Sequence, residues 1–339
     1  MNYPFSKHAL SKAEQVQSAL DNRPARKLVG IYGGWRGLSL KGLLADFSFW
    51  ARKNTAHKVG NAGALTELLV TLEKLENASN KTLPTNAPRT EFVIVGHSFG
   101  GAAVYSAICQ MTTERFVETV EKGRPLKPLG DQVILLNPAF EASRHYNLNE
   151  LAVSISKYPA TQRPVLSIFT SEGDWATHYA FPLGRFFAIL SQKFRHDKPQ
   201  RDANLDAVGW FSPFITHRLI YDATAKAGET NHSTFNLQTQ RHEPHSREKL
   251  RESALNIRAQ RSKWHPNGAK PAVYSFDDCR LEPRDAFRPG DPFLLVSVDK
   301  KIMKDHDDID NPVLRNFLRE YIHFCQTDPG GDQAESGGR

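Results

Sequence analysis

FVIVGHSFGGAAV, at Phe92–Val104, is the most informative run of residues in this chain. Its first residues are continuously apolar, which is typical of a strand that is buried on both faces of a sheet. Ser98 follows directly between two glycines, and the small residues after it suit the start of a helix. A strand, a sharp turn and a helix in this order hold a serine hydroxyl exposed above a sheet. We expect Gly96 and Gly100 to let this strained turn pass close to its neighbours without Cβ clashes.

Four further apolar runs predict strands of the same sheet: Leu28–Tyr32, Val133–Leu136, Val165–Phe169 and Phe293–Val298. Between them lie patterns with apolar residues every three or four positions, which predict helices with one buried face. Leu65–Leu75 and Pro312–Cys325 are the clearest of these. Strands that alternate with helices predict an α/β fold with a mostly parallel central sheet and helices on both faces.

The spacing of these runs predicts one core with an insertion. Residues 1–174 and 291–326 form the expected core, with an N-terminal helix at about 11–22. More than a hundred residues separate the last two strands, far beyond a crossover helix, so we interpret residues 175–290 as an inserted cap or lid. The polar, glycine-rich residues 327–339 predict a disordered tail.

A serine hydroxyl needs a histidine as general base and a carboxylate that orients this histidine. His306 lies in a short loop between the last apolar run and the last amphipathic helix, where such a base belongs; the alternative is a surface histidine in an acidic turn. Asp174 comes just past the run Val165–Phe169, and we predict it as the acid, with Glu172 in reserve. The alternative for Asp174 is a capping residue for a helix that begins nearby.

The oxyanion of an acyl-transfer reaction needs two backbone N–H donors. The residue after the nucleophile, Phe99, is the first expected donor. The loop at residues 31–37, IYGGWRG, follows the first apolar run, and Gly34 or Trp35 would provide the second. This loop lacks the lysine and hydroxyl residue of a phosphate-binding loop, so we do not interpret it as a nucleotide site.

Several apolar side chains follow that loop directly, and they suit the apolar part of a substrate. We predict Trp35, Phe47 and Trp50, with His97 beside the nucleophile, as substrate-binding residues. The segment Trp35–Trp50 would then form a lid or an acyl-binding wall, or it packs as an extra helix against the core.

With Ser98, Asp174 and His306 in this order, the chain resembles the α/β-hydrolase superfamily over residues 28–325. The runs Gly34–Gly37 and Phe49–His57 further resemble a group of largely uncharacterised microbial hydrolases. The resemblance implies an α/β-hydrolase fold and a serine esterase or lipase that works through an acyl-enzyme without a metal or an organic cofactor. Two features depart from the pattern: a tyrosine, Tyr32, stands where lipases carry a histidine, and the insertion is unusually long.

Two alternative functions follow from the same residues. The chain could be a binding or scaffold protein that keeps the hydrolase fold without turnover, or a lipase-type effector toxin that is exported without a cleaved signal. A patatin-like lipase is not expected, because its late Asp-Gly-Gly or Asp-Gly-Ala tripeptide does not occur here.

Composition limits the partners and the compartment. The chain has 40% hydrophobic and 24% charged residues, with a formal net charge of +7 that is spread along it, so we expect no nucleic-acid partner. Its three cysteines are too few and too scattered for a disulfide framework or a closed zinc site. We see no signal peptide and no transmembrane run, and therefore expect a cytoplasmic protein that acts on a small-molecule or lipid ester. Transient membrane contact and the oligomeric state stay open.

Overall fold

The computed structural model of the chain describes residues 27–34, 60, 63–84, 87–120, 122–159, 161–189, 197–222, 247–264 and 272–326. Three sequence predictions lie outside these ranges: the helix at 11–22, the tail at 327–339 and the segment 35–50 with Trp35, Phe47 and Trp50. None of the described helices combines the length and the apolar character that a membrane crossing demands.

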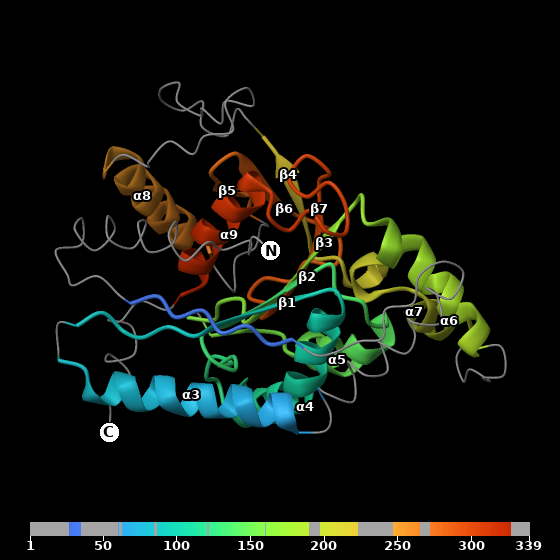
Figure 1. Cartoon of the computed structure of the whole chain (residues 1–339), viewed down its shortest axis with the longest axis horizontal. Helices are drawn as coiled ribbons and strands as arrows, with labels where there is room; N and C mark the ends of the chain where they lie inside the picture. Colours follow the sequence, from blue (N-terminus) through green and yellow to red (C-terminus); the bar gives the residue numbers. More distant parts are fainter. Residues whose placement is uncertain are drawn as a thin grey trace.

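The described residues form an α/β structure around one sheet of seven strands in the order β1-β2-β3-β7-β4-β6-β5 (Figure 1). Five neighbouring strands run parallel: β1 (Val93–His97), β2 (Gln132–Leu136), β3 (Leu166–Ser171), β7 (Phe293–Val298) and β4 (His217–Tyr221). The last two are antiparallel to their neighbours: β6 (Cys279–Pro283) and β5 (Tyr274–Phe276). The predicted α/β class and the mostly parallel sheet are thus confirmed.

Helices cover both faces of this sheet, and the alternation of side chains along β2 shows how. Val133 and Leu135 belong to a core with α3 (Ala64–Thr82), α4 (Phe99–Val120) and α5 (Tyr146–Ser154). Ile134 and Leu136 point the other way, into a core with α8 (Arg247–Lys263) and α9 (Pro312–Cys325). Because both faces are buried, the central strands need continuous apolar runs, which is why the sequence revealed them.

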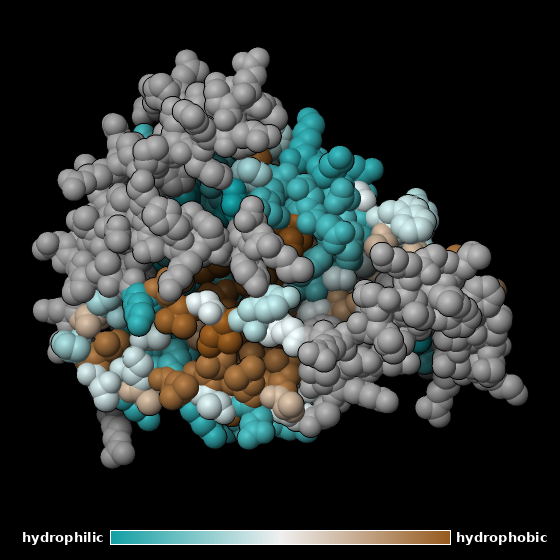
Figure 2. All heavy atoms as spheres, viewed as in Figure 1, coloured by the Kyte–Doolittle hydropathy of each residue, from teal (hydrophilic) through white to brown (hydrophobic). Residues whose placement is uncertain are grey.

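One strand prediction is wrong. Leu28–Tyr32 forms no strand; it has no regular structure, and Val29, Ile31 and Tyr32 are largely exposed. Gly30 interrupts this run, and a glycine weakens a strand because it adds entropy to the unfolded chain and no side chain to the packing. Figure 2 shows hydrophobic surface, in brown, on the face between α3 and β1. Val95 of β1 is also exposed.

The interpretation of residues 175–290 as an inserted cap needs a correction. This segment contributes β4, β5 and β6 to the main sheet, so this part of it belongs to the core. These strands give no continuous apolar run in the sequence, because they are buried on one face only and charged residues such as Arg218 and Arg280 alternate with apolar ones. The helices α6 (Phe181–Ile189) and α7 (Asp197–Leu205) of the same segment lie together beyond the strand ends (Figure 1).

Candidate active site

Ser98 lies in a strained turn between β1 and α4. Its φ of 54° is in the left-handed region, which residues other than glycine rarely adopt and which costs about 1–3 kcal/mol. Backbone hydrogen bonds hold this conformation: Ser98 N donates to Leu136 O at 3.0 Å, and Ala139 N donates to Ser98 O at 3.1 Å. Both partners lie at the carboxyl end of β2, so the neighbouring strand fixes the turn. The strand, turn and helix predicted around Ser98 are confirmed.

Two glycines allow this turn to pack, but they are not the two that the sequence suggested. A Cβ atom on Gly96 would lie 2.8 Å from the Cα of Gly101, and one on Gly101 would lie 2.8 Å from Pro138 Cβ. A Cβ on Gly100 would have nothing within 4 Å, so its predicted steric role is wrong. The close approach thus involves Gly96 and Gly101.

A chain of hydrogen bonds joins Ser98, His306 and Asp174. The distance from Ser98 Oγ to His306 Nε2 is 2.7 Å, and that from His306 Nδ1 to Asp174 Oδ1 is 2.9 Å. An ionised carboxylate only accepts hydrogen bonds, so Nδ1 of the ring donates to Asp174, and in the neutral ring Nε2 is left to accept the serine proton. The structure therefore brings together the three residues predicted from distant parts of the sequence.

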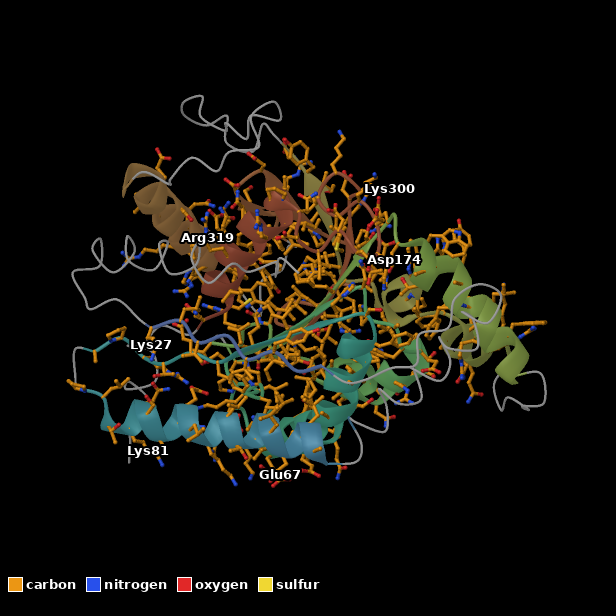
Figure 3. All side chains as sticks on the ribbon, in the orientation of Figure 1. Lys27, Glu67, Lys81, Asp174, Lys300 and Arg319 are labelled. Atoms are coloured by element: carbon orange, nitrogen blue, oxygen red, sulfur yellow. The ribbon has the colours of Figure 1, made fainter. Side chains whose placement is uncertain are left out.

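These three residues share one edge of the sheet. Ser98 follows β1, Asp174 follows β3 and His306 follows β7, and these strands are parallel, so their carboxyl ends meet. Figure 3 shows Asp174 at this edge with Lys300 nearby. Ser98 and His306 are partly accessible, whereas the side chain of Asp174 is fully buried.

Asn137 connects the loops that carry the acid and the base, and it is not among the predicted site residues. Its side-chain amide donates to His306 O at 2.9 Å and to Asp305 O at 3.2 Å, while its Oδ1 accepts from Ser171 N at 2.8 Å. Asn137 is fully buried, and its φ of 44° is left-handed. The signal in the sequence was an asparagine directly after the apolar run Val133–Leu136, a residue type that tolerates this conformation.

The environment of His306 favours its protonated form. Burial alone lowers the pKa of the imidazole, but the hydrogen bond and the charge of Asp174, together with the charges of Asp307 and Asp305, outweigh it. The pKa of His306 is therefore raised above its usual value. A base with a raised pKa takes a proton from the serine more readily but must be neutral to do so.

His97 contacts the predicted base, His306. Its Nε2 donates to His306 O at 2.8 Å, and the two ring centroids are 5.0 Å apart. Burial lowers the pKa of His97, which favours the neutral ring. His97 thus supports the backbone of the His306 loop, and its predicted contact with substrate stays a prediction.

Glu172, the reserve candidate for the acid, has other partners. Arg218 Nε and Nη2 donate to its two carboxylate oxygens at 2.7 and 3.0 Å, and Ser297 Oγ donates to Oε1 at 3.0 Å. Of the two carboxylates, Asp174 is the one hydrogen-bonded to His306.

The two predicted oxyanion donors, Phe99 and Gly34, differ in how the structure places them. Phe99 is the first residue of α4, where the positive end of the helix dipole favours negative charge. Gly34 is the last residue of the described segment 27–34 and is exposed to solvent. Its role as the second donor stays a prediction.

A metal ion has one candidate location among the described residues. Ligand atoms of His97, His306 and Asp307 lie within 4.8 Å of one another, and two imidazoles with a carboxylate form a donor set that suits zinc. Both ring nitrogens of His306 already have hydrogen-bond partners, however. A metal would therefore have to displace Ser98 or Asp174 from the imidazole.

Comparison of the chain with protein-family models, with curated proteins and with solved structures found no significant match.

Proposed function

We propose that this protein is a serine hydrolase that cleaves carboxylic esters through an acyl-enzyme intermediate. The observation that supports this most is the hydrogen-bonded chain from Ser98 through His306 to the buried Asp174, at 2.7 and 2.9 Å. The left-handed backbone conformation at Ser98 adds support, because strained conformations of this kind cluster at active sites.

The reaction follows from the protonation states of these groups. His306 Nε2 removes the proton of Ser98 Oγ as this oxygen attacks the ester carbonyl, and Asp174 stabilises the imidazolium that forms. The N–H of Phe99, with Gly34 as the predicted second donor, stabilises the oxyanion. The imidazolium then gives its proton to the departing alcohol. In the second half, His306 takes a proton from water as the water oxygen attacks the acyl group. The imidazolium then returns this proton to Ser98 Oγ as the bond to the acyl group breaks and the acid is released.

An exposed apolar face beside the acid supports an ester with an apolar group as substrate. Trp175, Tyr179, Leu183 and Phe186 follow Asp174 at intervals of three or four residues, which places them along one side of the helical segment, and all four are exposed. We therefore infer that the apolar part of the ester lies along this face.

The test is the loss of Ser98 in the full chain. We expect Ser98→Ala to abolish labelling by a fluorophosphonate probe and to lower kcat on p-nitrophenyl esters by about four orders of magnitude or more. Ser106→Ala is the matched control, since Ser106 lies on α4 and its hydroxyl donates to Ala102 O within that helix. Labelling of Ser98→Ala at the wild-type level would overturn the assignment, and a wild-type chain that takes no label would favour the scaffold alternative.

A further inference from the structure

The second oxygen of Asp174 has a donor of its own. Thr177 Oγ1 donates to Asp174 Oδ2 at 2.5 Å, while the Thr177 N–H donates to Oδ1 at 3.1 Å. Both residues are buried, with Asp174 0% and Thr177 1% exposed. The carboxylate that contacts His306 is therefore held from behind at both oxygens.

The direction of the Thr177 hydroxyl proton is fixed by a third residue. Trp210 Nε1 donates to Thr177 Oγ1 at 2.9 Å. An indole N–H can only donate, so the threonine oxygen accepts this bond and its own proton is left to point at Asp174. The bonds thus run in one direction, from Trp210 through Thr177 to the acid.

We propose that Thr177 and Trp210 are positioning residues that orient the Asp174 carboxylate toward His306. This inference rests on the proposed function, in which Asp174 orients the base. Neither residue touches the reacting atoms, and both act through Asp174.

Two short helical elements place Thr177 and Trp210 beside Asp174. A π-helical turn, Ala176–Ala180, begins two residues after the acid and places the Thr177 side chain back over the carboxylate. Trp210 comes from the short helix Val208–Trp210, and its ring stacks on that of His178 with centroids 3.7 Å apart and an interplanar angle of 3°. π-helical turns occur frequently at functional sites.

The position of Trp210 depends on the glycine before it. A Cβ atom on Gly209 would lie 1.8 Å from Thr170 Oγ1 at the end of β3, so no other residue allows this close approach. Trp210 belongs to the segment 175–290, which also supplies the strands β4, β5 and β6 and the helices α6, α7 and α8. The inserted segment thus takes part in building the acid site.

Removal of the Thr177 hydroxyl should let the Asp174 carboxylate change its orientation while the three residues Ser98, His306 and Asp174 stay in place. Thr177→Val keeps the shape but leaves Asp174 Oδ2 buried without its side-chain donor, so the carboxylate can turn away from His306. A misplacement of catalytic geometry by about 1 Å can cost on the order of 100-fold in rate. We expect Thr177→Val to lower kcat about 10- to 100-fold with KM nearly unchanged, and Trp210→Phe to lower it less.

The conservative variant and two controls separate positioning from loss of stability. Thr177→Ser keeps the hydroxyl and should restore most of the activity. Thr216→Val removes a buried threonine hydroxyl that donates to Leu295 O, and Trp264→Phe removes an indole N–H that donates to Gln162 O, both outside the candidate site. These two should keep kcat while their thermal stability falls as in the matching site variants. Equal loss of kcat in a control and its matching site variant would overturn the proposal.

A measurement without turnover tests the same inference independently of ester hydrolysis. We expect the proton between His306 Nδ1 and Asp174 Oδ1 to give a downfield resonance in the proton NMR spectrum, and its loss in His306→Gln would assign it. We expect Thr177→Val to shift or broaden this resonance and Thr177→Ser to keep it. An unchanged resonance in Thr177→Val refutes the positioning role, whereas a changed resonance in a chain that hydrolyses no ester refutes the proposed function alone.

Discussion

Gly173→Ala should damage the candidate site without touching any of its functional groups. A Cβ atom at this position would lie 1.9 Å from Lys304 O, and carbon atoms of this kind essentially never come closer than 3.0 Å to a neighbour. Lys304 O belongs to the backbone and cannot rotate away. The loop that carries Asp174 and the loop that carries His306 must therefore separate by about 1 Å, a shift that can cost on the order of 100-fold in rate.

Hydrogen bonds through Ser171 also hold these two loops together. Gly173 N donates to Ser171 Oγ at 2.9 Å, and Ser171 Oγ donates to Met303 O at 2.5 Å. These bonds oppose the shift, so we expect a loss of stability of about 1–3 kcal/mol, as for other overpacked sites. The protein should stay folded at 25 °C while kcat/KM falls.

The assay is the hydrolysis of a p-nitrophenyl ester, with urea unfolding measured on the same preparations. Gly30→Ala is the control, because a Cβ at Gly30 has nothing within 4 Å and this residue is exposed. We expect kcat/KM of Gly173→Ala to fall about 100-fold and that of Gly30→Ala to stay within about twofold. Full activity in a folded Gly173→Ala protein would refute the reasoning, since it would mean that the two loops need not touch.

Three more predictions concern the charges around this site and in the core. Asp174→Asn should lower kcat about 10⁴-fold by presenting the wrong partner to the imidazole, whereas Glu172→Gln should change it by less than about threefold; similar losses in steady-state assays would reverse the choice of acid. His306 must be neutral to act as the base, so kcat/KM should decrease as the pH falls through the pKa of His306, which is raised above the usual histidine value. Asp307→Asn removes a charge that raises this pKa, so the decrease should begin at a lower pH. A pH profile in which the decrease does not move contradicts this cause. Burial lowers the pKa of His217 to about 3, so its contribution to stability is present above about pH 6.5 and is lost as pH falls toward 3; His217→Leu should flatten the dependence of the urea midpoint on pH in this range, and an unaltered slope would show that His217 is not its source.

The parts of the fold that could be predicted are those whose pattern is visible in a short stretch of sequence. A strand buried on both faces needs a continuous apolar run, which is why β2, β3 and β7 could be recognised from the sequence. Their order along the chain then placed Ser98, Asp174 and His306 at one sheet edge, because parallel strands end together. The same rule failed for Leu28–Tyr32, an apolar run that is largely exposed and forms no strand.

The parts that could not be predicted depend on contacts between distant residues. Thr177 and Trp210 are an ordinary polar and an ordinary aromatic residue in the sequence, and nothing near them in the chain indicates that they orient the acid. Only the fold brings Trp210 to Thr177, 33 residues away along the chain. The steric role assigned to Gly100 failed for a similar reason, because the close neighbour of this turn is Pro138, two residues after the end of β2, and it faces Gly101.

The position of β7 has a consequence for how the protein folds. Among the described strands this one comes last in the sequence, yet it pairs with β3 on one side and β4 on the other. Until it arrives, β1-β2-β3 and β4-β6-β5 are two half-sheets with exposed apolar edges, which other chains can pair with. Contacts over such long sequence separations form slowly. A growing chain that has not yet reached Phe293 should therefore depend on chaperones more than the finished protein does, and a copy that ends before this residue should aggregate.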